Sequence, residues 1–228
     1  MISAILLAGG SGTRAGNGIP KQLIKINGIP MIEYSVRIVQ KIKGIDFFIV
    51  VVRETDKNYV KDICNNYSKF KGMVIGGETR QQSVFAGLKK IMKKNVEKVL
   101  IHDTARPFSG NVFKNVLAGL EGHESSIPVV EVKDSLCKVV KNECWEKTEY
   151  VDRNDYFKVQ TPQGFEYEKI YSAHVKAFEN SKNDYSDDGS LFAVYFGNLN
   201  LVKGDVENIK ITYPLELEIA EKIAVKGK

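Results

Sequence analysis

The sequence is poor in the features of disulfide-linked, metal-clustered and membrane-spanning proteins. Its 228 residues include only three cysteines and one tryptophan. Cys64, Cys137 and Cys144 are odd in number and lack metal-ligand spacing, which predicts free thiols in a reducing cytoplasm. No apolar run approaches the roughly 18 residues of a membrane span, and no signal-peptide pattern opens the chain. We therefore expect a cytoplasmic protein without a membrane segment.

A large excess of positive charge is also missing. The chain carries 33 Lys and Arg against 28 Asp and Glu, a net charge of +5. These cations are scattered and no basic run is interleaved with aromatic residues, so nucleic acid is not an expected partner. A modest positive charge suits a small anionic ligand instead. The length is enough for one α/β domain with a full core, and we expect a single domain over residues 1–228.

Short apolar runs alternate with helical patterns along most of the chain. Strand-like runs cover 2–7, 47–52, 73–75, 99–101 and 200–203, and helical patterns cover 31–42, 56–67, 81–92, 167–180, 187–196 and the segment from about 212. Asp56 is a candidate N-cap for the second helix. This alternation predicts right-handed crossovers and a mostly parallel, doubly wound sheet. In such sheets, ligands bind beyond the carboxyl ends of the strands.

The pattern changes near residue 131. Residues 135–140 and 144–151 are typical of two strands joined at 141–143, which predicts a β-hairpin arm over 131–153. An isolated hairpin is only marginally stable in water, so we expect this arm to pack on another protein surface, such as that of a second subunit.

The first strand leads into a glycine-rich loop. Three glycines fall within four positions, at Gly9, Gly10 and Gly12, and the cations Arg14 and Lys21 follow. Glycines let the backbone turn sharply and let N–H groups approach a ligand closely. The combination predicts a polyphosphate site.

The same loop also matches the dinucleotide fingerprint G-x-G-x-x-G/A, which alone is a weak signal. That motif needs a helix to begin inside it, whereas residues 16–20 are helix-breaking. Glu33 has the spacing of the expected ribose-binding acid but lies in a helical pattern. The dinucleotide interpretation is therefore disfavoured, and an ordinary glycine turn is the other alternative.

Two further loops follow strands at the same edge of the predicted sheet. In residues 76–83, glycine N–H groups and the Ser83 hydroxyl could contact a base or ribose. The alternative there is a capping box between Thr79 and Gln82. In residues 102–107, Asp103 is the candidate ligand for Mg²⁺, a ribose or a substrate hydroxyl. His102 is the neighbouring strand residue and should point to the opposite face, which favours a structural role for it. No Ser or Cys pairs with a His in a triad, so covalent catalysis is not expected.

Eight segments together resemble the cytidylyltransferases that act on polyol phosphates. They are LLAGGSGTR, PKQ, GGETRQQSV, HDTARP, VDRN, TPQGF, YSDDGSL and ENIKIT, within residues 5–212. The resemblance implies a Rossmann-like nucleotidyltransferase fold whose hairpin arm embraces a second subunit. It also implies CTP and a polyol phosphate as substrates, Mg²⁺ as cofactor, and release of pyrophosphate.

The resemblance further implies roles for individual residues. Arg14 and Lys21 match the pair that stabilises the charged transition state. Matches to CTP-binding positions are Leu7, Ala8, Gly9, Gly10, Gly77, Ser83 and Asp103, and matches to substrate-positioning residues are Arg106, Ser135, Arg153, Thr161 and Lys210. From the residues alone, Arg153 could clamp a phosphate or form an ion pair with Asp152 or Asp155, and Lys210 could be an ordinary exposed lysine.

The acceptor is expected to be 2-C-methyl-D-erythritol 4-phosphate, with ribitol 5-phosphate as the alternative. The segments VDRN and YSDDGS favour the first acceptor. The opening Leu7-Ala8-Gly9-Gly10 is more similar to the ribitol enzymes, and Ser135 stands where a threonine is common. A catalytically silent nucleotide-binding protein is a third possibility, disfavoured because the four expected cations and Asp103 are all present.

Overall fold

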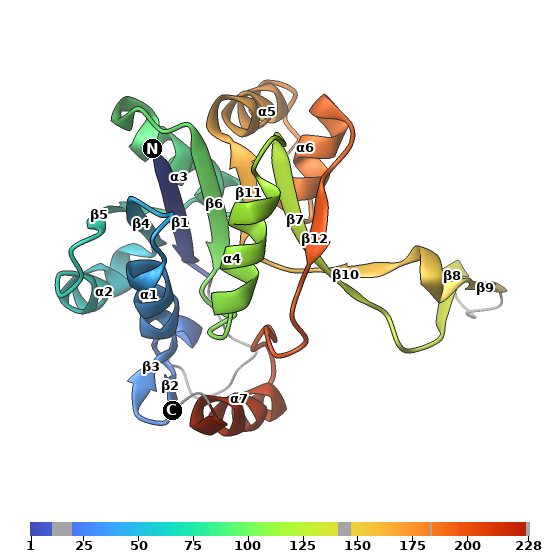
Figure 1. The fold of residues 1–228 in the computed structure, drawn as a ribbon, viewed down its shortest axis with the longest axis horizontal. Coiled ribbons are helices and arrows are strands. Elements are labelled where there is room, and N and C mark those ends of the chain that lie inside the picture. The colour runs from blue at the N-terminus through green and yellow to red at the C-terminus, as the bar shows by residue number, and fades with distance from the viewer. Residues whose placement is uncertain (11–19, 141–146, 183, 227–228) are drawn as a thin grey trace.

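The computed structural model describes residues 1–10, 20–140, 147–182 and 184–226. Its centre is an eight-stranded sheet of order β10-β7-β11-β6-β1-β4-β5, with β12 paired to β7 (Figure 1). The strands are β1 (Ile2–Ala8), β4 (Phe47–Val52), β5 (Phe70–Ile75), β6 (Lys98–Asp103), β7 (Ser125–Glu131), β10 (Phe157–Val159), β11 (Gln163–Glu166) and β12 (Leu201–Lys203). A small second sheet pairs β2 (Lys25–Ile26) with β3 (Ile29–Pro30).

The parallel part of the sheet confirms the predicted α/β class. β1 lies parallel to both β4 and β6, and β4 lies parallel to β5. All six residues of β4 are buried, as expected of a strand covered on both faces. One feature was not predicted: β11 lies between β6 and β7 and runs antiparallel to both.

Helices cover both faces of this sheet. They are α1 (Met31–Lys41), α2 (Lys57–Cys64), α3 (Arg80–Ile91), α4 (Gly110–Gly119), α5 (Tyr167–Glu179) and α6 (Asp188–Phe196). A further helix, α7 (Pro214–Lys226), packs against β2 instead. Short 3₁₀ helices span Lys21–Leu23, Glu54–Asp56, Met92–Lys94 and Arg153–Asp155. None of the described helices is long and apolar enough to cross a membrane.

Alternate residues of β1 supply two separate hydrophobic cores. Ile5 belongs to the core that α3, α5 and α6 cover, and Leu6 to the core that α1, α2 and α4 cover. This division follows from the two-residue period of a strand. A third, smaller cluster joins Ile26 and Met31 to Ile211 and Ala220, and it holds α7 beside the start of α1.

Two predictions at helix ends need correction. Helix α2 ends at Cys64 rather than near residue 67, and Asp56 precedes the helix without capping it. The Asp56 carboxylate instead accepts hydrogen bonds from Gln22 at 2.6 Å and from Arg53 at 2.8 Å. Gln22 from a distant segment and Arg53 from just before the helix thus occupy the carboxylate in place of a cap. Helix α4 was not predicted at all.

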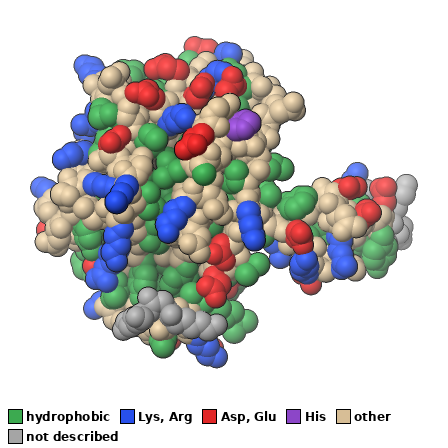
Figure 2. Space-filling view, in the orientation of Figure 1, with side chains coloured by type: hydrophobic (Ala, Val, Ile, Leu, Met, Phe, Trp, Pro, Cys, Tyr) green, Lys and Arg blue, Asp and Glu red, His purple; other side chains and the backbone are tan. Residues whose placement is uncertain are grey.

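The predicted hairpin is present in its described part. Strands β8 (Leu136–Val140) and β9 (Lys147–Val151) pair antiparallel, with Leu136 opposite Val151. The arm stands clear of the body (Figures 1 and 2). The predicted turn at 141–143 and Cys144 lie outside the described residues.

Candidate active site

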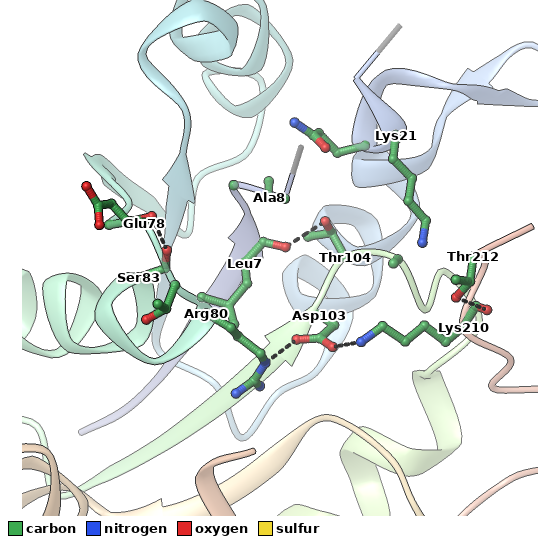
Figure 3. A pocket seen from close by; sticks show the side chains of 16 residues that line it. Leu7, Ala8, Lys21, Glu78, Arg80, Ser83, Asp103, Thr104, Lys210 and Thr212 are labelled. Atoms are coloured by element: carbon green, nitrogen blue, oxygen red, sulfur yellow. Dashed lines mark hydrogen bonds and ion pairs between the residues drawn. The ribbon is translucent and has the colours of Figure 1, made fainter. Parts of the chain in front are cut away.

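The ends of three parallel strands enclose a cavity of about 520 Å³. Its lining residues come from β1, the β5–α3 turn, β6, the 3₁₀ helix at Lys21 and the segment before α7: Leu7, Ala8, Gly9, Gly10, Lys21, Gln22, Gly77, Glu78, Thr79, Arg80, Ser83, Asp103, Thr104, Ala105, Lys210 and Thr212 (Figure 3). Strand register explains the convergence, because Leu7 lies opposite Asp103 at the end of the β1–β6 pair. The three loops therefore meet at one sheet edge, as predicted.

Of the fourteen residues to which the family resemblance gives a site role, nine line this cavity. They are Leu7, Ala8, Gly9, Gly10, Lys21, Gly77, Ser83, Asp103 and Lys210. Arg14 lies outside the described residues. The remaining four, Arg106, Ser135, Arg153 and Thr161, are not among the lining residues.

The turn before α3 combines close packing with a helix cap. Thr79 accepts a hydrogen bond from the Gln82 N–H at 3.1 Å, and Gln82 Oε1 accepts one from the Glu78 N–H at 2.9 Å. A Cβ on Gly77 would lie 2.5 Å from the Gln82 Cβ, so only glycine fits against this cap. The capping box that the sequence left as an alternative is thus confirmed. Gly77 and Ser83 also line the cavity, so a contact of this turn with a base or ribose stays a prediction.

Asp103 is the electrostatic centre of the cavity. Arg80 Nε donates to its Oδ1 at 3.1 Å, and Lys210 Nζ donates to its Oδ2 at 2.7 Å (Figure 3). Burial would raise the pKa of this carboxyl, but the charges of Arg80 and Lys210 outweigh burial and hold its pKa well below the usual range. Asp103 is therefore ionised at neutral pH.

Thr161 lies beneath Asp103 rather than in the cavity. Its hydroxyl accepts from the Asp103 N–H at 3.1 Å and lies 3.1 Å from His102 Nδ1. His102 Nε2 lies 3.2 Å from the Arg106 carbonyl, which can only accept, so Nε2 carries the proton and Nδ1 accepts from Thr161. Burial lowers the pKa of His102 to about 3, so the ring is neutral. His102 is therefore a structural histidine, as its position next to Asp103 in the strand predicted.

Arg106 braces the segment that carries Lys210. Its guanidinium donates to the Asn208 carbonyl at 2.8 Å and to the Val159 carbonyl at 3.4 Å. Burial is the main cause that lowers the pKa of Arg106. In this arrangement Arg106 acts on the shape of the site through two backbone contacts.

Ser135 and Arg153 lie on or beside the arm and are both exposed. Arg153 Nη1 donates to the Lys133 carbonyl at 2.6 Å. Within the described part of the chain, neither Asp152 nor Asp155 forms an ion pair with Arg153, so that alternative is wrong. The exposed guanidinium has further donors that remain available to a ligand.

The donor set suits a metal carried by a substrate rather than a resident metal. No group of three or more His, Cys, Asp and Glu among the described residues could hold an ion. The ionised Asp103 nonetheless faces the cavity, and Mg²⁺ is commonly held by one or two carboxylates together with substrate phosphates. Asp103 fits that mode of binding.

Sequence reasoning missed Arg80, Asp188 and His174. Arg80 Nη1 donates to Asp188 Oδ2 at 2.8 Å, and His174 Nε2 lies 3.1 Å from Asp188 Oδ1. Arg80 and Asp188 both occur in segments that carried the family resemblance, which was the available signal. Their pairing joins residues 108 positions apart and is visible only in the fold.

The Rossmann-like sheet, the glycine turns and the cations around one carboxylate define an α/β enzyme of the nucleotidyltransferase class. The comparisons with known proteins then give the family. The family model described as IspD, 2-C-methyl-D-erythritol 4-phosphate cytidylyltransferase, matches residues 2–226, and the chain belongs to this family.

Individual relatives agree with this assignment. The chain is 37% identical over 229 residues to the 2-C-methyl-D-erythritol 4-phosphate cytidylyltransferase of Shouchella clausii, covering 98% of this chain and 96% of that one. It is 36% identical over 231 residues to the bifunctional IspD/IspF enzyme of Bartonella bacilliformis, of whose length it spans 57%. The crystal structure of 4-diphosphocytidyl-2C-methyl-D-erythritol synthase from Anaerococcus prevotii superposes with a TM-score of 0.86 at 30% identity, covering 98% of this chain and 96% of that one.

Proposed function

We propose that this enzyme transfers CMP from CTP to 2-C-methyl-D-erythritol 4-phosphate. The products are 4-diphosphocytidyl-2-C-methyl-D-erythritol and pyrophosphate. The observation that carries the proposal is the grouping of Lys21, Asp103 and Lys210 around a cavity edged by glycine turns, in a chain of this family. Such a cavity binds a nucleoside triphosphate and neutralises the charge that the reaction brings together.

The reaction requires positioning and charge neutralisation rather than a protein nucleophile. An oxygen of the acceptor phosphate attacks the α-phosphorus of CTP, and the bond from that phosphorus to the α–β bridging oxygen breaks. Pyrophosphate leaves with the electron pair. Both reactants are anions, so cations must offset their repulsion. We assign this role to Lys21 and Arg14, and we assign CTP binding to Leu7, Ala8, Gly9, Gly10, Gly77, Ser83 and Asp103.

We further propose Mg²⁺ as the cofactor, held by Asp103 together with the CTP phosphates. When bound, the ion would neutralise phosphate charge and make the pyrophosphate a better leaving group. Asp103 supplies the ionised oxygen, and the buried Thr161 hydroxyl fixes the backbone at that carboxylate.

Acceptor binding is assigned to Lys210 and to Arg153, the latter supplied by a second copy of the chain. Lys210 lies in the cavity, while Arg153 and Ser135 lie at an arm that stands clear of the body. Exposed apolar side chains accompany the arm, including Tyr150 at 79% exposure and Phe157 at 46%. A homodimer in which this arm covers the partner's cavity would bury them. Thr161 and Arg106 act in acceptor positioning only through the residues that they brace.

A cytoplasmic location stays a prediction, made from the free thiols.

Pyrophosphate release tests the proposal directly. The purified protein is incubated with CTP and Mg²⁺, and 2-C-methyl-D-erythritol 4-phosphate and ribitol 5-phosphate are compared side by side. We expect a strong preference for the first acceptor and loss of release in excess chelator. Preference for ribitol 5-phosphate would overturn the acceptor assignment. CTP binding without release for either acceptor would indicate a silent nucleotide-binding protein.

A further inference from the structure

Asp188 lies behind the active site and is joined to it through Arg80. The Asp188 side chain is 2% exposed and is not among the residues that line the cavity. Arg80 donates through Nη1 to Asp188 at 2.8 Å and through Nε to Asp103 at 3.1 Å. One guanidinium is therefore divided between two carboxylates, of which only Asp103 faces the cavity.

The position of Asp188 is fixed from three sides. His174 lies 3.1 Å from its second carboxylate oxygen, and the His174 ring stacks on Phe85 at 5.8 Å between centroids. The helix start is closed by a capping box between Asp187 and Ser190. Gln163 adds a further bond, since its Oε1 accepts from the Gly189 N–H at 3.0 Å. Asp188 is consequently held in one position and fixes the Arg80 guanidinium that it binds.

The division of Arg80 has an electrostatic consequence for Asp103. A guanidinium presents a planar fork that binds both oxygens of one carboxylate when no second acceptor competes. The two donors that could bind both oxygens of Asp103 are Nε and Nη2, but Nη2 has no hydrogen-bond partner among the described residues. Asp188 holds Nη1 and so fixes the guanidinium in an orientation in which only Nε reaches Asp103, at Oδ1. The other oxygen, Oδ2, is left to Lys210, whose side chain is 45% exposed and able to move. A ligand in the cavity can therefore replace Lys210 at Oδ2 of Asp103, while Oδ1 stays bound to Arg80.

We propose that Asp188 is a positioning residue for CTP binding: by holding Arg80 to one side, it keeps Oδ2 of Asp103 accessible to the incoming nucleotide and its cation. This inference rests on the proposed function, because it assigns the accessible oxygen to CTP. Without the Asp188 charge, the guanidinium would turn so that Nε and the unpartnered Nη2 pair with both oxygens of Asp103. CTP would then have to displace a bidentate ion pair, whereas Lys210, released from Oδ2, would still be able to bind the acceptor phosphate.

Asp188→Asn tests this inference, with Asp187→Asn as the matched control. Both substitutions remove one carboxylate charge at the start of α6, but only Asp188 contacts Arg80. For Asp188→Asn we expect the CTP dissociation constant, measured by calorimetry with Mg²⁺ and without acceptor, to rise at least about tenfold. The KM for CTP should rise in parallel, while the KM for the acceptor stays within about twofold. Asp187→Asn should leave all three constants within about twofold of wild type.

A purely structural role gives a different pattern. In that case Asp188→Asn lowers the melting temperature but leaves CTP binding within about twofold of the control, which would overturn the proposal. If Asp188→Asn does not fold, His174→Gln provides the second variant, because it loosens Asp188 while keeping both carboxylates and Arg80. We expect a smaller loss, confined to CTP, of about threefold, and an unchanged CTP dissociation constant would again refute the inference. CTP binding needs no acceptor, so a wrong acceptor assignment would leave this test intact.

Discussion

Replacing Thr161 by valine separates two roles for this residue. The sequence placed Thr161 among the substrate-positioning residues, whereas in the fold its hydroxyl bonds to His102 Nδ1 and to the Asp103 N–H, each at 3.1 Å. Thr161 is 5% exposed. Valine keeps the shape and removes only the hydroxyl, so the substitution leaves two buried polar groups without a partner.

The expected cost follows from these two groups. Leaving a buried donor or acceptor unsatisfied costs about 1–3 kcal/mol, so Thr161→Val should lower the free energy of unfolding by about 2–6 kcal/mol. For a chain of this size each kcal/mol corresponds to about 2–4 °C in Tm, so the fall should be at least about 4 °C. Thr161→Ser keeps the hydroxyl and removes one methyl group, which should cost only about 1 kcal/mol.

Urea unfolding and steady-state kinetics of the two variants decide between the roles. We expect Thr161→Val to be the less stable variant and to lose turnover, because Asp103 loses the bond that fixes its backbone. Thr161→Ser should retain both stability and turnover. The reasoning would be refuted if Thr161→Val unfolded at the wild-type urea concentration while its KM for the acceptor rose, since that result is the signature of direct substrate contact.

Three further predictions concern charge, pH and close packing. Lys21→Ala should lower kcat by about 100-fold or more with little change in Tm, because Lys21 lines the cavity and its proposed role is to neutralise the reacting phosphates. Steady-state rates and thermal unfolding check this. The free energy of unfolding should fall as the pH falls below about 6.5. In that range His102 takes up a proton in the unfolded chain, whereas in the folded protein it stays neutral down to its pKa of about 3. The free energy of unfolding should change by up to about 1.4 kcal/mol per pH unit because of this histidine. His102→Gln should lose this dependence, as measured by urea unfolding from pH 4 to 7. Gly77→Ala should cost about 1 kcal/mol in the same assay, because its Cβ would lie 2.5 Å from Gln82 Cβ and disturb the α3 cap.

The parallel half of the sheet could be predicted because each of its signals is local. β4 is a continuous apolar run whose six residues are all buried, and the glycine turns follow strands at one edge. Parallel strands in a doubly wound sheet must end at the same edge, so the meeting of Gly10, Gly77 and Asp103 follows from topology. That inference needs no knowledge of side-chain direction.

The antiparallel half and the far side of the site could not be predicted in the same way. β11 is only four residues long and includes Gly164, so it carries no clear periodicity, yet it lies between two other strands. The direction of the Thr161 side chain depends on how β11 enters the sheet. The ion pair of Arg80 with Asp188 depends on the packing of α6 near α3, which no local pattern encodes.

Burial determines which charged contacts at this site can be exchanged for a ligand. Arg80 and Lys210 both contact Asp103, but their side chains are 27% and 45% exposed. Moving the mostly buried Arg80 guanidinium away from its carboxylates leaves uncompensated charges, which is costly. The half-exposed Lys210 ammonium can exchange one partner for water or phosphate at little cost. Asp188 strengthens this difference between Arg80 and Lys210. Burial lowers the pKa of Arg80, but the charges of Asp188 and Asp103 outweigh burial and raise that pKa above its ordinary value. We therefore expect Arg80 to keep its place when phosphates enter the cavity and Lys210 to change partners.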